Sequence, residues 1–76
     1  MQSSQLQDLI VSKLTLEHGG TKRRWRIAVG PIKLHSSAIH AHCNWSVAPS
    51  GTPHENSQIE RLMDDLRLAH PVVSAG

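Results

Sequence analysis

The chain has 76 residues, which is enough for one domain and too few for a two-domain enzyme, a nucleotide-binding α/β sheet or a barrel. Hydrophobic residues make up 38% of the sequence, and the formal net charge is only +2, so the composition is that of a globular chain rather than a disordered one. We expect a single small domain over residues 1–71 and a flexible tail over residues 72–76.

The charge is distributed unevenly along the chain. Residues 1–34 hold six basic and two acidic residues, whereas residues 35–76 hold two basic and four acidic ones. Such asymmetry suits an anionic partner for the first half, or the association of two copies through unlike halves.

Cys43 is the only cysteine, so no disulfide can form within the chain. Small secreted domains usually carry several disulfides, and their absence favours a reducing compartment. No apolar run approaches the roughly 18 residues that a membrane span needs. The N-terminus also lacks the charged and apolar regions of a signal peptide. These features predict a cytoplasmic protein that does not interact with membranes.

The first thirteen residues allow two interpretations. Ser4 and Gln7 have the spacing of a helix cap, and a short helix would place Leu6, Leu9, Ile10 and Leu14 on one side. The run Leu9–Val11 could equally begin a first strand.

A β-hairpin is expected around Gly19 and Gly20. These glycines separate residues 14–17 from residues 24–29, and both flanks alternate between apolar and polar residues. In this interpretation Trp25, Ile27 and Val29 share the buried face. Gly30 and Pro31 then interrupt the second strand.

Residues 38–47 predict another strand, because apolar and polar residues alternate strictly there. Cys43, Trp45 and Val47 fall on the apolar face, whereas His40, His42 and Asn44 fall on the polar one. Both tryptophans, Trp25 and Trp45, are therefore predicted to lie in the core.

The last element is a helix that begins near Thr52. Thr52 and Glu55 have the spacing of a capping box, with Pro53 at the first helical position. Pro71 is expected to end the helix. One apolar stripe follows the helical period: Ile59, Leu62, Met63, Leu66 and Ala69.

Together these elements predict an α+β fold in which a three-stranded antiparallel sheet packs on one long C-terminal helix. The element order is βββα, or αβββα if the N-terminal helix forms.

The candidate binding residues gather on the polar face of that sheet. They are basic or imidazole side chains: Lys22, Arg23, Arg24, Arg26, His40 and His42. Such a cationic face suits contact with a protein or with an anionic polymer such as a nucleic acid. Both tryptophans fall on the other face, so the surface lacks the aromatic rings on which bases stack.

A metal site is the alternative. His40 and His42 would lie on the same face of one strand, at a spacing that can chelate a metal ion. A zinc site needs three or four protein ligands, and no local spacing commits a further one. The bare sequence therefore predicts no bound metal and no other cofactor.

No catalytic group stands out. Cys43 falls among apolar residues, where cysteine acts as a small hydrophobic side chain.

The leading prediction is a small non-enzymatic binding module. The alternatives are a metal-binding protein that uses His40 and His42, and a small enzyme or toxin-like protein that acts on RNA. A homodimer is also expected, with its contact at a strand edge or at the N-terminal segment.

Overall fold

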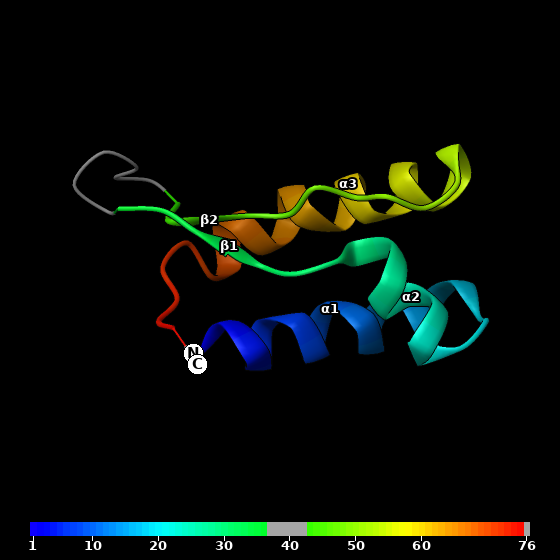
Figure 1. Ribbon diagram of the computed structural model, residues 1–76, viewed down its shortest axis with the longest axis horizontal. Helices are drawn as coiled ribbons and strands as arrows, with labels where there is room; N and C mark the ends of the chain where they lie inside the picture. Colours follow the sequence, from blue (N-terminus) through cyan, green and yellow to red (C-terminus); the bar gives the residue numbers. More distant parts are fainter. Residues whose placement is uncertain (37–42, 76) are drawn as a thin grey trace.

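The computed structural model describes residues 1–36 and 43–75 of the chain (Figure 1). Over these residues the protein is mainly helical, with a short antiparallel pair of strands. In chain order the elements are α1 (Ser3–His18), α2 (Lys22–Val29), β1 (Lys33–Leu34), β2 (Trp45–Ser46) and α3 (Pro53–Ala69). The predicted α+β fold with a three-stranded sheet on one long helix is therefore wrong.

Helix α1 settles the ambiguity at the N-terminus in favour of a helix, and it is longer than expected. Its start is stabilised by the Gln2 backbone N–H, which donates to the Gln5 side chain at 2.8 Å. Its end lies at Gly19, where φ is +74°, a conformation that favours glycine. The buried side chains follow the helical period: Leu6, Ile10, Val11 and Leu14.

Helix α2 replaces the second strand of the predicted hairpin. Its buried residues are Trp25, Ala28 and Val29, which have the i, i+3, i+4 spacing of a helix face. Ile27, which the strand interpretation placed in the core, is 57% exposed. The burial of both tryptophans is confirmed, although Trp25 reaches the core from a helix.

The described part of the predicted strand 38–47 is much shorter than expected. Lys33 pairs with Ser46 and Leu34 pairs with Trp45, so the sheet consists of two two-residue strands. Residues 37–42 lie outside the described residues.

Helix α3 confirms the sequence prediction at both ends. The Thr52 side chain accepts a hydrogen bond from the Glu55 N–H, and the Glu55 carboxylate accepts one from the Thr52 N–H. The last helical residue is Ala69, two positions before Pro71. Ile59, Met63 and Leu66 are buried, whereas Leu62 is half-buried and Ala69 is exposed.

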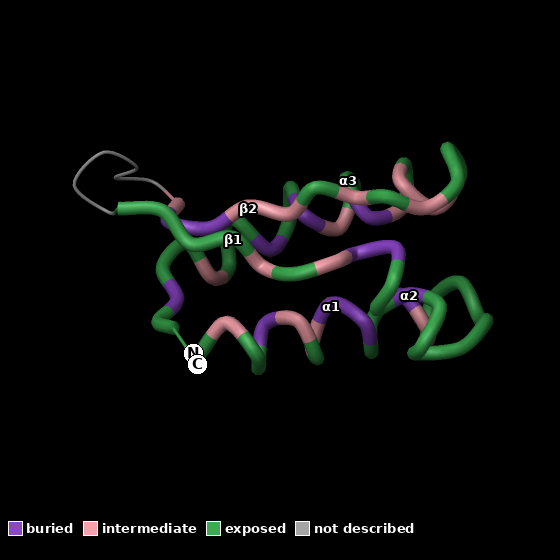
Figure 2. The backbone as a smooth tube through the Cα atoms, in the orientation of Figure 1, coloured by how far each residue is buried: buried purple, intermediate pink, exposed green. Residues whose placement is uncertain are grey.

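A single apolar cluster joins these elements. Figure 2 shows buried positions on each of the three helices and along β2. The cluster comprises the buried side chains of α1, α2 and α3 together with Trp45 and Val73. No helix of the described residues is long and apolar enough to cross a membrane.

The C-terminal segment contributes to the fold through hydrogen bonds to Asn44 and to the N-terminus. Val73 is buried, and its backbone N–H and C=O both bond to the buried Asn44 side chain, at 2.9 and 2.7 Å. Ser74 then pairs with the N-terminus: its C=O accepts from the Ser3 N–H, and its N–H donates to the Met1 C=O. Asn44 was predicted to face solvent, and its burial follows from this pairing with a segment 29 residues away.

Replacing Asn44 with alanine should destabilise the fold. The change removes two hydrogen bonds to the backbone of Val73, each worth about 1 kcal/mol, so we expect a loss of about 2 kcal/mol in the free energy of unfolding. Urea denaturation measures this loss. Val72→Ala is the matched control, because Val72 is exposed in the same segment. Equal midpoints for the two variants would contradict the structural role of Asn44.

Candidate binding surface

Helix α2 carries four of the six predicted site residues. Half of its eight residues are cationic, namely Lys22, Arg23, Arg24 and Arg26, and none is acidic. The helix begins after Thr21, whose side-chain oxygen accepts a hydrogen bond from the Arg24 N–H at 3.2 Å. The four cations therefore lie on one short helix and not on the face of a sheet.

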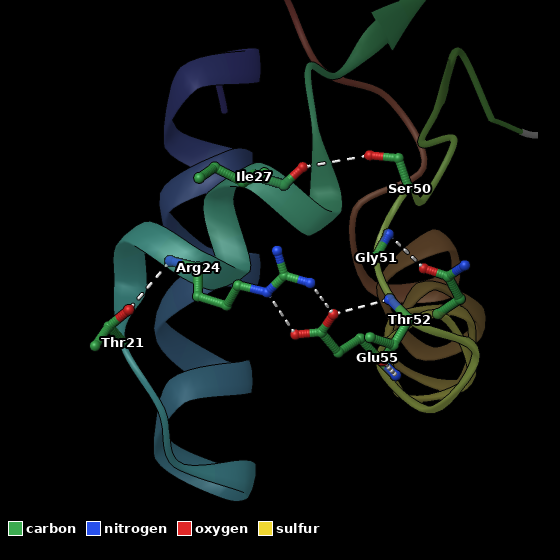
Figure 3. A network of polar contacts seen from close by, with 8 residues as sticks. Thr21, Arg24, Ile27, Ser50, Gly51, Thr52 and Glu55 are labelled. Carbon is green, nitrogen blue, oxygen red and sulfur yellow. Dashed lines mark hydrogen bonds and ion pairs between the residues drawn. The ribbon is translucent and has the colours of Figure 1, made fainter.

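Arg24 points toward α3 and forms a bidentate ion pair with Glu55 (Figure 3). Its Nη2 donates to one carboxylate oxygen at 2.7 Å, and its Nε donates to the other at 3.0 Å. Such forked geometry is the strongest arrangement for an arginine and a carboxylate. Because Glu55 is also part of the α3 cap, one carboxylate joins two helices.

The pKa of Glu55 falls from its ordinary value of 4.5 to about 2. The hydrogen bonds from the Arg24 guanidinium are the main cause, and the hydrogen bond from the Thr52 backbone N–H adds to them. The carboxylate therefore stays charged through nearly the whole acidic range.

The loop before α3 also holds the end of α2. The Ser50 N–H donates to the Ala28 C=O at 2.8 Å. The Ser50 hydroxyl donates to the Ile27 C=O at 3.4 Å, as Figure 3 shows. At Gly51 a Cβ atom would lie 2.9 Å from the Ala28 Cβ and 2.6 Å from a Glu55 oxygen. Glycine is required at position 51 because α2 and α3 approach so closely there.

The opposite side of α2 is held to α1. Arg26 pairs with Asp8 at 3.1 Å, and the Gln7 amide donates to the Gly30 C=O at 2.8 Å, just beyond the end of α2. Both partners of the Arg26 ion pair are largely exposed, so this pair stabilises the fold less than the bidentate pair between Arg24 and Glu55 does.

Two of the four cations, Arg24 and Arg26, thus form ion pairs with other described residues. Lys22 and Arg23 are exposed and make no ion pair with any of the described residues. The other two predicted site residues, His40 and His42, lie outside the described residues.

Sequence reasoning missed an exposed apolar residue in this surface. Ile27 lies one helical turn after Arg23 and borders a shallow groove of about 460 Å³. The groove lies between the start of α1, the end of α2 and the segment that follows α2. Its lining residues are Ser3, Ser4, Gln7, Arg26, Ile27, Gly30, Pro31 and Ile32. A helical period applied to residues 22–29 would have placed Ile27 on the outside.

The remaining chemical candidates are a metal site and the thiol of Cys43. Among residues 1–36 and 43–75, no three His, Cys, Asp or Glu side chains lie close enough together to hold a metal ion. Cys43 is half-buried against the core, and its thiol donates to the Trp45 C=O at 3.3 Å.

Comparison of the chain with protein-family models, curated proteins and solved structures found no match.

Acid should weaken the fold through Glu55. Because its pKa is lower in the folded chain than in the unfolded chain, the ion pair stabilises the fold fully above about pH 4.5, and the stabilisation is lost as the pH falls toward 2. We expect Glu55→Gln to lower the melting temperature at pH 6 and to flatten its decrease between pH 4.5 and 2.

The matched control for this experiment is Glu60→Gln. It removes one exposed carboxylate from the same helix without breaking an ion pair present among the described residues. This variant should keep the acid sensitivity of the native chain. If the melting temperature of Glu55→Gln fell with pH in parallel with that of the native chain, Glu55 would not be the group responsible for the acid sensitivity.

Proposed function

We propose that the protein is a small, non-enzymatic, cytoplasmic binding module that docks on an acidic protein surface through the outer face of α2. This outer face, called the α2 face below, consists of Lys22, Arg23 and Ile27. The observation that carries the proposal is the pair of exposed cations at Lys22 and Arg23, which form no ion pair with any described residue and lie beside an exposed isoleucine. The free thiol of Cys43 supports a reducing compartment.

The position of these cations in the helix supports an external anion. The first turn of α2 contains basic residues and no acidic residue, although the positive end of the helix dipole disfavours cations there. Each such placement costs about 0.3–1 kcal/mol at an exposed site. Glu55 compensates Arg24, whereas a carboxylate on a partner would compensate Lys22 and Arg23.

A protein partner fits these residues better than a nucleic acid does. Lys22 and Arg23, the two cations of α2 without an ion pair among the described residues, would release about two counterions from a phosphate backbone, which is few for a nucleic-acid-binding surface. Both indole rings are buried, so neither can stack on a base. Ile27 is 57% exposed, and an apolar side chain gains more from a protein surface than from a phosphate backbone.

A poly-glutamate peptide provides a defined acidic probe. We expect the native chain to bind it and Lys22→Gln/Arg23→Gln to bind it about tenfold more weakly, because each exposed ion pair contributes up to about 1 kcal/mol. Fluorescence anisotropy with a labelled peptide, measured at several salt concentrations, gives the affinities. Added salt should weaken the binding of the native chain.

The control variant Lys13→Gln/Arg61→Gln removes the same charge from α1 and α3 and should bind nearly as well as the native chain. An equal loss in both variants would show that net charge alone governs binding. Tighter binding to a DNA duplex than to the peptide, with a dependence on salt steeper than two counterions explain, would replace the protein partner with a nucleic acid.

A further inference from the structure

We infer that the acidic partner of the α2 face binds as an extended segment, which pairs with the outer edge of β1 as a third strand. This inference rests on the proposed function, because it specifies the conformation in which the same partner docks. Three features of the described residues carry it: an open strand edge, a groove that joins this edge to the α2 face, and exposed cations at both ends of that path.

The backbone of Leu34 forms the open edge of β1. On either side of it, Lys33 pairs with Ser46, and the His35 N–H donates to the Asn44 C=O at 2.7 Å. Because hydrogen-bonded and non-hydrogen-bonded pairs alternate in an antiparallel ladder, the N–H and C=O of Leu34 point away from β2. Neither group forms a hydrogen bond with another described residue. Leu34 therefore presents one donor and one acceptor to a further strand.

This edge is accessible from solvent. Both residues of β1 are exposed, and Leu34 has an exposed fraction of 38%. Pro31, which precedes the strand, is exposed as well. Figure 1 shows β1 between β2 and the start of α1, so the outer edge faces the side on which α1 begins. A third strand would therefore lie between β1 and the start of α1.

The groove beside α2 continues from this edge. Ile32, which directly precedes β1, lines the groove together with Ile27 of the α2 face. Ser3 and Ser4, at the start of α1, line it as well. An extended segment that pairs with β1 can thus continue through the groove and reach Ile27 along the surface.

The charges along this path favour acidic side chains. Lys33 lies in β1, whereas Lys22 and Arg23 lie in the first turn of α2, and none of the three forms an ion pair with a described residue. Asp8 pairs with Arg26, a groove residue, and so compensates a different cation. An acidic segment would complement cations at both ends of the path.

Lys33 also argues against a second copy of the chain as the third strand. A lysine on an exposed edge opposes the pairing of two like edges, because both copies bring the same charge to the contact. Carboxylates on the incoming strand are attracted to the same lysine. The edge therefore selects an acidic segment of another protein.

Hydrogen exchange of backbone amides tests the strand pairing directly. The probe is an eight-residue peptide of alternating glutamate and valine, which as a strand has one acidic and one apolar face. In the free chain the Leu34 amide should exchange rapidly, whereas the His35 amide should be protected by its bond to Asn44. Saturating peptide should slow the exchange of Leu34 at least tenfold, as measured by NMR.

A proline variant removes the donor at this edge. Leu34→Pro deletes an N–H that makes no bond to β2, and proline is tolerated where the N–H of an edge strand faces solvent. This variant should bind the peptide about fivefold more weakly, as expected for the loss of one neutral hydrogen bond. Leu34→Ala is the matched control, because it loses the side chain and keeps the N–H, and it should bind nearly as well as the native chain.

Two results would overturn the inference: unchanged exchange of Leu34 in the native chain saturated with peptide, or equal affinities of Leu34→Pro and Leu34→Ala. Protection of Leu34 that depends on protein concentration without peptide would replace the acidic segment with a second copy.

The proposed function is tested separately by Lys22→Gln/Arg23→Gln with the same peptide. Weaker binding of this variant, together with unchanged exchange of Leu34 in the native chain, would keep the α2 face and exclude the third strand. Protection of Leu34 with an unchanged affinity of the variant would exclude the α2 face instead. No binding of the peptide to the native chain would exclude both.

Discussion

Helix α2 has only eight residues, and isolated helices shorter than about 12–15 residues are marginal in water. It therefore exists because its neighbours hold it. One side of the helix is buried in the core through Trp25, Ala28 and Val29. The bidentate ion pair between Arg24 and Glu55 connects it to α3, and the ion pair between Arg26 and Asp8 connects it to α1. These contacts decide which cations of the chain remain exposed and which are neutralised.

Sequence patterns predicted α3 well because its signals are local. The cap at Thr52, the first-turn Pro53 and the stop at Pro71 all act within a few residues of the helix. The sequence of α2 supports two periods at once. Trp25, Ile27 and Val29 alternate as in a strand, whereas Trp25, Ala28 and Val29 match a helix, and the neighbouring structure decides between them.

The remaining differences come from contacts between residues far apart in the sequence. Ala28 lies against Gly51, and a larger residue at either position would keep α2 and α3 apart. Asn44 is buried because both groups of its side-chain amide form hydrogen bonds with the backbone of Val73, near the C-terminus. Neither partner can be identified from local periodicity. The cationic residues of α2 could be named from the sequence, but the ion pairs that Arg24 and Arg26 form with Glu55 and Asp8 could not be predicted from it.

Folding also determines which charged side chains of α2 form ion pairs with the neighbouring helices. Glu55 and Asp8 neutralise Arg24 and Arg26, so the two cations of α2 that form no ion pair with a described residue lie in its first turn, close to the start of α3. The exposed carboxylates Asp64 and Asp65 lie toward the far end of α3, two to three turns away from Glu55. Asp64 pairs there with Arg67 of the same helix at 3.7 Å, so part of this negative charge is compensated within α3. For Lys22 and Arg23, a carboxylate on a partner would provide the compensation that Glu55 gives to Arg24, and the small energy of exposed ion pairs would keep such a contact reversible.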